Sequence, residues 1–438
     1  KPAIAPSRPQ RKGHPVGPLR IGIAGLGHVG AGLIELVQRQ DRLRLPGRVE
    51  IAGVSARSQS RNRPVSTDSY PWFDDAATLA EDPNVDAFVE LIGGSDGPAK
   101  FAVETALKAG KHVVTANKAL IAKHGIALAA LAAEKHVDLL FEAAVAGGIP
   151  VVRVLRDSLV GTELKRVSGI LNGTCNFITS TMLETGRAYE EVLAEAQKRG
   201  YAEADPTLDV SGMDAAHKAA ILSAIAFSAD LDFSKVEVRG IEEIGLLDLR
   251  LADRLGLRIK LIAEGVLTRA GVVCRVEPMA LPHAHALARV DGSLNAVRIE
   301  GDPLGAVVLT GPGAGSGPTA SAVMGDVAKL FRPAIRNAFG RAQHHVAQPF
   351  VSGDASEIAP FFLRVRLADK PGTLAALTEA LAEEGVSVDK LLQDSADESG
   401  ASPVAVVTHR CPRAQMQAAV NRIAKLSVSV EDPRLIRI

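Results

Sequence analysis

The segment from Arg20 to Gly30 constrains the fold more than any other part of this sequence. An apolar run ends in glycine, and Gly25-Leu26-Gly27-His28-Val29-Gly30 then forms a GxGxxG motif that opens a helical segment. The first glycine permits a tight turn, the second lets the backbone approach a pyrophosphate, and the third allows the helix to pack closely on the strand. Free N–H groups at the helix N-terminus then face the phosphates. At a strand-to-helix junction the motif predicts dinucleotide binding, although an isolated glycine turn can be purely structural.

Apolar runs alternate with helical segments as far as about residue 150. After the first run, the others lie at 49–57, 85–94, 111–116 and 137–144. This alternation predicts a parallel sheet with crossover helices, an α/β domain of Rossmann type at residues 20–150. Hydrophobic residues make up 47% of the chain and aromatic residues only 4%, which suits helices packed on such a sheet.

The rest of the chain divides into two further domains. Residues 151–345 mix helices with strands and predict an α+β substrate-binding and dimerisation domain. Residues 346–360 have the composition of a loop and are expected to be a linker. Residues 361–438 have the order βαββα, and a last strand is expected to follow, which gives a ferredoxin-like βαββαβ pattern. Residues 1–19 are rich in proline and basic residues, lack the apolar segment of a secretory signal, and are expected to form a disordered arm.

Charge and cysteine content exclude several classes of function. Fifty basic and fifty acidic residues cancel, so no bulk charge recruits nucleic acid or an anionic membrane surface. No apolar run reaches the roughly 20 residues that a membrane-spanning helix needs. Cys175, Cys274 and Cys411 lie far apart and form no metal-ligand spacing, which fits a reducing cytoplasm.

The end of the second apolar run bears on the choice between NAD and NADP. An acidic residue there would bind the ribose 2′-hydroxyl, but the run ends in Ser55 and Arg57, and Arg61 and Arg63 follow. A hydroxyl and a guanidinium suit a 2′-phosphate, so the sequence favours NADP(H), with NAD(H) also open as a cofactor. The alternative is a solvated basic loop.

The densest group of polar residues, 200–218, precedes an apolar helical stretch. Asp214 and Lys218 are four residues apart and share one helix face. That face continues through Ile221 and Ile225, so the pair is predicted to point inward and to have a functional role. A surface ion pair, which contributes little, would lie opposite this apolar stripe.

Other polar segments also follow apolar strands. Thr115 and Lys118 come at the carboxyl end of one, where open α/β sheets bind ligands, although Lys118 could also be a solvated loop lysine. Residues 142–150 combine a carboxylate with glycine-exposed carbonyls that suit a hard cation, but a plain turn is favoured from the residues alone. The polar groups of 172–176 could hold an amino-acid headgroup or cap a helix. Residues 311–319 form a second glycine-rich loop, either a ligand contact or a turn.

Taken together, these segments resemble the homoserine dehydrogenase family. They cover nearly all of residues 20–345, and the segment at 200–218 is the most specific of them. The resemblance rests on GLGHVG, TANK, EAAVAGGIP, NGTCNFI, GYAEADPTLDVSGMDAAHK and GPGAGSGPTASAVMGD, in that order. It implies an NADP-dependent enzyme that interconverts L-aspartate 4-semialdehyde and L-homoserine in threonine, methionine and isoleucine biosynthesis.

The resemblance also implies roles for individual residues. Lys218 is expected to be the proton donor, with Lys118 as a second lysine at the reacting centre and Asp214 holding the first. The residues expected at the substrate are Glu203, Asp209, Asp214 and Thr174. The residues expected at the cofactor are Gly25, Leu26, Gly27, His28, Val29, Gly30, Arg57, Gly94, Thr115, Lys118, Gly200, Glu203 and Gly315. A sodium ion is expected at Glu142 and the carbonyls of Val145, Gly147 and Ile149.

Residues 361–438 resemble an ACT domain, a small amino-acid sensor, through the turn Asp369–Leu374. In this family the domain implies feedback inhibition by L-threonine, and a homodimer or homotetramer. Two rival functions stay open. An aspartate-semialdehyde dehydrogenase needs a cysteine nucleophile, for which Cys175 in its NGTCN setting is a poor match. A non-catalytic sensor of NADP and amino acids would have no need of the carboxylates and lysine at 200–218.

Overall fold

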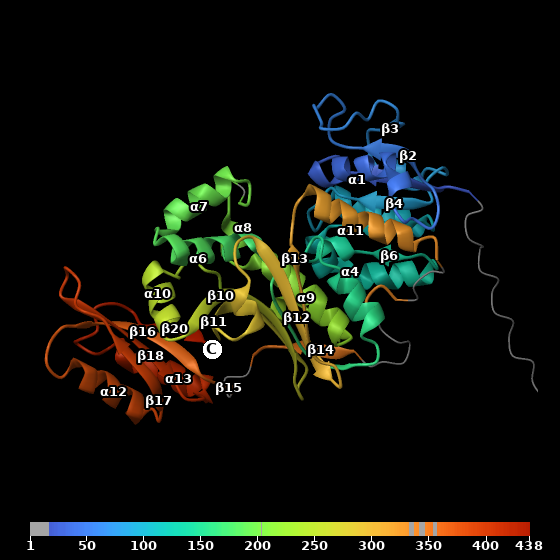
Figure 1. The fold of residues 1–438 in the computed structure, drawn as a ribbon. Coiled ribbons are helices and arrows are strands. Elements are labelled where there is room, and N and C mark those ends of the chain that lie inside the picture. The colour runs from blue at the N-terminus through green and yellow to red at the C-terminus, as the bar shows by residue number, and fades with distance from the viewer. Residues whose placement is uncertain (1–16, 203, 333–336, 341–346, 354–356) are drawn as a thin grey trace, which may run out of the picture. The chain divides into compact units, whose positions relative to one another are not determined.

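The computed structural model describes residues 17–202, 204–332, 337–340, 347–353 and 357–438, which form two compact units. The first unit consists of residues 17–144 together with the described residues between 315 and 340. The second consists of residues 145–314 and the described residues from 347 onward. Figure 1 shows the elements of each unit.

The first unit contains a six-stranded parallel sheet with the order β3-β2-β1-β4-β5-β6. This is the strand order of a doubly wound dinucleotide-binding fold, so the Rossmann prediction is confirmed. Strand order reverses between β1 and β4, and ligands of such sheets bind at the carboxyl ends of the strands there. The strands are β1 (Leu19–Ala24), β2 (Val49–Ser55), β3 (Trp72–Phe73), β4 (Ala87–Glu90), β5 (His112–Thr115) and β6 (Leu139–Leu140).

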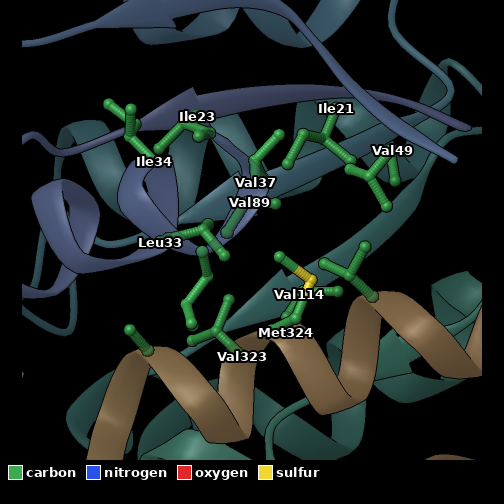
Figure 2. Packing of buried hydrophobic residues seen from close by; sticks show 14 of the residues in the cluster. Ile21, Ile23, Leu33, Ile34, Val37, Val49, Val89, Val114, Val323 and Met324 are labelled. Atoms are coloured by element: carbon green, nitrogen blue, oxygen red, sulfur yellow. The ribbon is translucent and has the colours of Figure 1, made fainter. Parts of the chain in front are cut away.

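A helix from late in the sequence completes this unit. Its helices are α1 (His28–Gln38), α2 (Ala76–Glu81), α3 (Pro98–Lys108), α4 (Lys118–Glu134) and α11 (Ser316–Lys329). Val323 and Met324 of α11 pack with Leu33 and other residues of α1 and the sheet in one buried cluster (Figure 2). A Cβ on Gly32 of α1 would lie 2.8 Å from the Ser316 hydroxyl, so glycine there lets the two helices approach.

The position of α11 differs from the expected boundaries, which assigned all of residues 151–345 to the second domain. Figure 1 shows α11 in orange among the blue and teal helices of the first unit. The apolar stripe of α11 reveals that one face is buried, but periodicity cannot reveal which sheet buries it.

The second unit is built on a long mixed sheet with the order β13-β12-β7-β10-β11-β20-β16-β18-β17. Its strands before the C-terminal region are β7 (Glu163–Ile170), β8 (Ala229–Asp230), β9 (Glu237–Val238), β10 (Leu257–Leu267), β11 (Val272–Pro282), β12 (Leu294–Asp302) and β13 (Gly305–Pro312). Its helices are α5 (Val151–Arg153), α6 (Gly173–Thr185), α7 (Tyr189–Lys198), α8 (Thr207–Val210), α9 (Met213–Ala226) and α10 (Leu246–Arg254). The α9 helix packs on the central strands, where Ser223 contacts Cys274 of β11.

The C-terminal region has the predicted βαββαβ order. Its elements are β16 (Phe361–Ala368), α12 (Thr373–Glu383), β17 (Val388–Gln393), β18 (Ala401–Thr408), α13 (Arg413–Ile423) and β20 (Arg434–Arg437), with the short β19 (Cys411–Pro412) before α13. The β20 strand joins this module to the sheet of the second unit, because Arg437 pairs with Met279 of β11.

The expected linker contains two short strands. β14 (Gln348–Val351) pairs with β8 and β11, and β15 (Ile358–Ala359) pairs with β19. These pairings use backbone groups, so the loop-like composition of residues 346–360 could not reveal them. Most of the arm expected at residues 1–19 lies outside the described residues. Within the part of the chain that the structure describes, no helix is both long enough and apolar enough to cross a membrane.

Candidate active site

The glycine motif forms the turn between β1 and α1. Gly25 has φ +104°, and a Cβ there would lie 2.3 Å from the Leu91 carbonyl oxygen, so only glycine fits. A Cβ on Gly30 would lie 2.2 Å from the Gly25 carbonyl oxygen. At Gly27, in contrast, an added Cβ would have no atom within 4 Å, and this is where a pyrophosphate has to approach. The turn therefore fits a dinucleotide, with Leu26 buried below it and His28 exposed.

A second helix begins beside this turn. Gly315, with φ +118°, precedes α11, and the Ser316 hydroxyl donates a hydrogen bond of 2.6 Å to the carbonyl oxygen of His28. The N-termini of α1 and α11 therefore lie together, and each presents backbone N–H groups that favour an anion. This places Gly315 next to the GxGxxG turn, although the two are almost 300 residues apart in sequence.

The carboxyl end of β2 carries the basic residues expected at a 2′-phosphate. Arg57 is exposed two residues after the strand ends, while Ser55 is buried and its carbonyl oxygen accepts a bond of 2.9 Å from Gly25 N–H. Arg63 contacts the face of Trp72 and donates to the carbonyl oxygens of Gln59 and other loop residues. Arg63 therefore braces the loop, whereas Arg57 is open to a ligand.

The ends of β4 and β5 lie side by side in the same sheet. Gly94 is exposed in the loop after β4, and its carbonyl oxygen accepts a bond of 2.7 Å from the Asn117 side chain. Asn117 also caps α4, whose first residue is the half-buried Lys118. Thr115 is fully buried and its hydroxyl donates to Glu90, so it supports this edge from below instead of presenting a hydroxyl to a cofactor.

In the second unit, Asp214 and Lys218 point inward as the sequence predicts. The Lys218 side chain is 11% exposed, and its ammonium donates 2.7 Å to Asp214 Oδ2 and 2.8 Å to the carbonyl oxygen of Leu171. The α9 helix begins at Met213, which puts Asp214 in its first turn, where the helix dipole favours a carboxylate. Because an ammonium has three N–H donors, the two bonds that Lys218 forms with described residues leave it one further donor.

Asn172 brings the other polar residues to this pair. Its side chain caps α6 by accepting from Cys175 N–H, and it donates 2.7 Å to Asp209 and 3.0 Å to Asp214. Thr174, in the first turn of α6, donates 2.6 Å to the carbonyl oxygen of Tyr201. The first turn of α6 thus gathers Asp209, Asp214 and the chain just before residue 203. The polar segment at 172–176 is a helix cap as well as part of the site.

The remaining residues expected at the substrate, the cofactor and the cation have different environments. Glu203 lies outside the described residues, and Gly200 is exposed with φ +73° at the end of α7. In the cation segment, Glu142, Val145, Gly147 and Ile149 are all buried, and Gly147 has φ +52°. Among the described residues, no group of three or more histidine, cysteine, aspartate or glutamate side chains could hold a metal.

Cys175 is fully buried, and its thiol donates 3.2 Å to the carbonyl oxygen of Asp209. Burial raises the pKa of the Cys175 thiol well above its ordinary value, and the nearby carboxylates of Asp209 and Asp214 raise it further. A thiol in this setting does not form the thiolate that nucleophilic catalysis needs. The His217 ring stacks on the Phe233 ring, with 4.6 Å between the ring centroids.

Two residues of these networks, Asn172 and Glu90, have no expected role of their own from the sequence. Glu90 is a fully buried carboxylate at the end of β4. The sequence pattern that could have identified Glu90 is an acidic residue at the end of an apolar strand, shortly before the glycine pair Gly93 and Gly94.

The first unit has a dinucleotide-binding fold, and the second holds a buried, oriented ammonium group that can donate a proton. Together these features are typical of a nicotinamide-dependent dehydrogenase. Comparisons with known proteins narrow this class. Family models match the chain as homoserine dehydrogenase at residues 150–328, the NAD-binding domain of homoserine dehydrogenase at 25–142, and an ACT domain at 361–428. The chain belongs to the homoserine dehydrogenase family, whose members are oxidoreductases that act on a CH–OH group.

Individual relatives agree along nearly the whole chain. A homoserine dehydrogenase of Pseudomonas aeruginosa is 42% identical over 423 residues, which cover 93% of this chain and 96% of the relative. The crystal structure of a homoserine dehydrogenase from Thiobacillus denitrificans has a TM-score of 0.89 at 37% identity, with 96% and 98% of the two chains covered. A hyperthermophilic archaeal homoserine dehydrogenase in complex with NADPH has a TM-score of 0.62 at 28% identity, with coverages of 71% and 97%.

Proposed function

We propose that this homoserine dehydrogenase uses NADP(H) to interconvert L-aspartate 4-semialdehyde and L-homoserine, with Lys218 as the proton donor. The observation that carries the proposal is the geometry of Lys218. Its ammonium is buried and oriented by Asp214 and the Leu171 carbonyl, and it keeps one N–H for a further acceptor. A carbonyl oxygen that becomes negatively charged during reduction is such an acceptor.

Bound NADPH supplies the hydride for the aldehyde carbon. Lys218 stabilises the negative charge that develops on the aldehyde oxygen and delivers a proton to it, directly or through one water. Asp214 holds the ammonium in place, and Lys118 adds a second positive charge at the reacting centre. Carboxylates of the segment 203–214 pair with the ammonium group of the substrate. In the reverse direction, neutral Lys218 accepts the hydroxyl proton of homoserine.

Three features support NADP over NAD. Arg57 is exposed at the end of β2, no acidic residue follows that strand directly, and a related archaeal enzyme binds NADPH. The GxGxxG turn with Gly94, Gly200, Glu203 and Gly315 is proposed to hold the rest of the cofactor. A spectrophotometric assay with L-homoserine and NADP⁺ tests the proposal. Formation of NADPH that needs no phosphate supports it, and the absence of activity under these conditions contradicts it.

The same assay distinguishes the rival functions. An aspartate-semialdehyde dehydrogenase would form NADPH from the aldehyde only when phosphate is present. The buried, hydrogen-bonded thiol of Cys175 argues against that reaction. A non-catalytic sensor would form no NADPH at all, and the buried Asp214–Lys218 pair argues against that alternative.

A sodium ion is proposed at Glu142 and the carbonyls of Val145, Gly147 and Ile149. One carboxylate and three carbonyl oxygens are a donor set that suits a hard cation, and these residues are buried. Replacing sodium by a large organic cation in the assay buffer should lower the thermal stability, and restoring sodium should recover it. Unchanged melting in the two buffers would contradict the ion site.

Regulation and assembly are proposed from the C-terminal module. It is expected to bind L-threonine, and the enzyme is expected to be a homodimer or homotetramer that acts in threonine, methionine and isoleucine biosynthesis. The ACT family match at residues 361–428 supports an amino-acid effector. Light scattering of the purified protein tests the assembly, and a monomeric mass would contradict it.

A further inference from the structure

Glu90 is a buried carboxylate that the proposed reaction has not used. It is the last residue of β4 and is 0% exposed. Its Oε1 accepts from the N–H groups of Ile92, at 2.7 Å, and Gly93, at 3.0 Å. Its Oε2 accepts from the hydroxyl of Thr115. All three donors are neutral, and among the described residues no cationic side chain forms a salt bridge with Glu90.

The hydrogen-bond partners of Glu90 suit a carboxylate. The Thr115 hydroxyl oxygen accepts a bond of 2.9 Å from Asn117 N–H, and its O–H donates to Glu90 Oε2. The two backbone N–H groups can only donate. Each contact of Glu90 is therefore one that a carboxylate accepts.

Glu90 and Asn117 hold the loop after β4 from two sides. Glu90 binds the N–H groups of Ile92 and Gly93, and Asn117 binds the Gly94 carbonyl at 2.7 Å. Gly93 and Gly94 have φ +89° and +85°, and a Cβ added at either would meet nothing closer than 3.9 Å. The loop is thus fixed on the protein side and open on the other.

The position of this loop in the fold indicates which part of a bound dinucleotide would contact it. In a doubly wound sheet the dinucleotide crosses the crevice at the carboxyl ends of the strands where the order reverses, here between β1 and β4. A dinucleotide bound in this way would place its pyrophosphate at the N-terminus of α1, on the β1 side. Its nicotinamide half would then reach the carboxyl end of β4, where Glu90 binds the N–H groups of Ile92 and Gly93.

Holding a loop with a buried carboxylate that has no cationic partner is energetically unfavourable. Burying an ionised group costs several kcal/mol unless an opposite charge or strong hydrogen bonds offset it. A neutral glutamine could accept from the same backbone N–H groups. The hydrogen bonds therefore do not explain the negative charge, which a nearby cation would stabilise. The oxidised nicotinamide ring is a cation, whereas the reduced ring is neutral.

We propose that Glu90 is a positioning residue that holds the Ile92–Gly94 loop, and that its charge favours bound NADP⁺ over bound NADPH. The inference rests on the proposed use of NADP(H). In the protein interior a unit charge still acts at separations beyond direct contact, so a neutral residue at this position should change the ratio of the two affinities by about tenfold.

The test measures the dissociation constants of NADP⁺ and NADPH, by calorimetry and by fluorescence, for the wild type and for Glu90→Gln. The ratio of the NADP⁺ constant to the NADPH constant should rise about tenfold in Glu90→Gln. A matched control is Asn117→Ala, which releases Gly94 but keeps the Glu90 charge. It should weaken both cofactors to a similar extent and leave the ratio at the wild-type value.

Binding of the nicotinamide-free fragment 2′-phospho-ADP-ribose should be nearly unchanged in Glu90→Gln. If Glu90→Gln does not fold, the double variant Glu90→Gln/Thr115→Val supplies the neutral case, because it removes the hydroxyl that the amide nitrogen would face. An unchanged ratio in the folded neutral variant overturns the charge role. A wild-type protein that binds neither NADP⁺ nor NADPH contradicts the proposed function, and the inference with it.

Discussion

At the scale of single residues, the fold holds a few polar side chains of the candidate site in fixed orientations. Lys218 is oriented by Asp214, which is in turn bound by Asn172 at the cap of α6. The sequence predicted that Asp214 and Lys218 turn inward, because helix periodicity places them on the apolar face. It could not predict that Asn172 contacts Asp214, because 42 residues separate the two and only the tertiary fold joins them.

Arg57 provides a residue-scale prediction about cofactor preference. Arg57→Ala should lower kcat/KM for NADP⁺ by roughly tenfold to a hundredfold and leave that for NAD⁺ nearly unchanged, because a charge-assisted bond to the 2′-phosphate contributes about 1.5–3 kcal/mol. The measurement is steady-state kinetics with both cofactors. Arg44→Ala, which removes another exposed arginine of the same unit, is the control. A preference that stays the same in Arg57→Ala would place the 2′-phosphate elsewhere.

At the scale of elements, the sequence predicted most helices and strands but not all of their partners. The parallel strands, α9 and the βαββαβ order of the C-terminal module follow from hydrophobic periodicity. The return of α11 to the first unit does not, because an apolar stripe on a helix fits any apolar surface. Buried charges were also missed. Arg275 of β11 and Arg437 of β20 both contact Glu264 of β10, on the sheet face opposite Cys274 and α9.

This ion cluster gives a prediction about the attachment of the C-terminal module. Arg437 is 5% exposed and donates to Glu264 and, at 2.8 Å, to Glu277. Arg437→Met should destabilise the second unit by about 3 kcal/mol, because it leaves buried carboxylates short of a partner. Arg434→Met on the same strand, which removes an ion pair with the exposed Glu243, should cost less than about 1 kcal/mol. Urea unfolding measures the free energy of unfolding of both variants. Equal losses of stability would contradict a special role for the buried ion cluster.

The same cluster predicts how stability depends on pH. Burial alone would raise the pKa of Glu264, but the charges of Arg437, Arg275 and Arg166 outweigh it and hold the pKa at about 2. Because the folded-state pKa lies below the ordinary value of 4.5, the stabilisation is complete above pH 4.5 and is lost as the pH falls toward 2. The loss over this window should amount to about 3 kcal/mol.

Urea midpoints measured at several pH values between 5 and 2 test this dependence, and the slope should be smaller in Glu264→Gln. The exposed Glu184, replaced in Glu184→Gln, serves as the control and should keep the wild-type slope. A Glu264→Gln protein with the full wild-type slope would show that other carboxylates cause the acid sensitivity.

At the scale of the whole molecule, the chain is interleaved. The second unit contains residues 145–314, which interrupt the first unit between residues 144 and 315. Boundaries predicted from composition miss such an arrangement, because both units contain helices and strands of similar character. The C-terminal module continues the sheet of the second unit through β20 and β11, so it is attached to the same sheet on which α9 packs.

This attachment carries a prediction about regulation. L-threonine should inhibit the full-length enzyme, with a coupling of about 1–3 kcal/mol between effector and substrate, or roughly fivefold to 150-fold in affinity. Gly372 has φ +90° before α12, so Gly372→Ala should distort that turn and weaken inhibition, while the rate without threonine stays near the wild-type value. D-threonine is the control ligand. Equal effects of both enantiomers would contradict a specific effector site.

The turnover of Lys218→Ala tests most directly the proposed proton transfer from Lys218. Its kcat for reduction of L-aspartate 4-semialdehyde should fall by about 10²–10⁴-fold, while the dissociation constant of NADPH changes little. Lys198→Ala, which removes an exposed lysine at the end of α7, should behave as wild type. A Lys218→Ala enzyme that keeps the wild-type kcat would contradict the account.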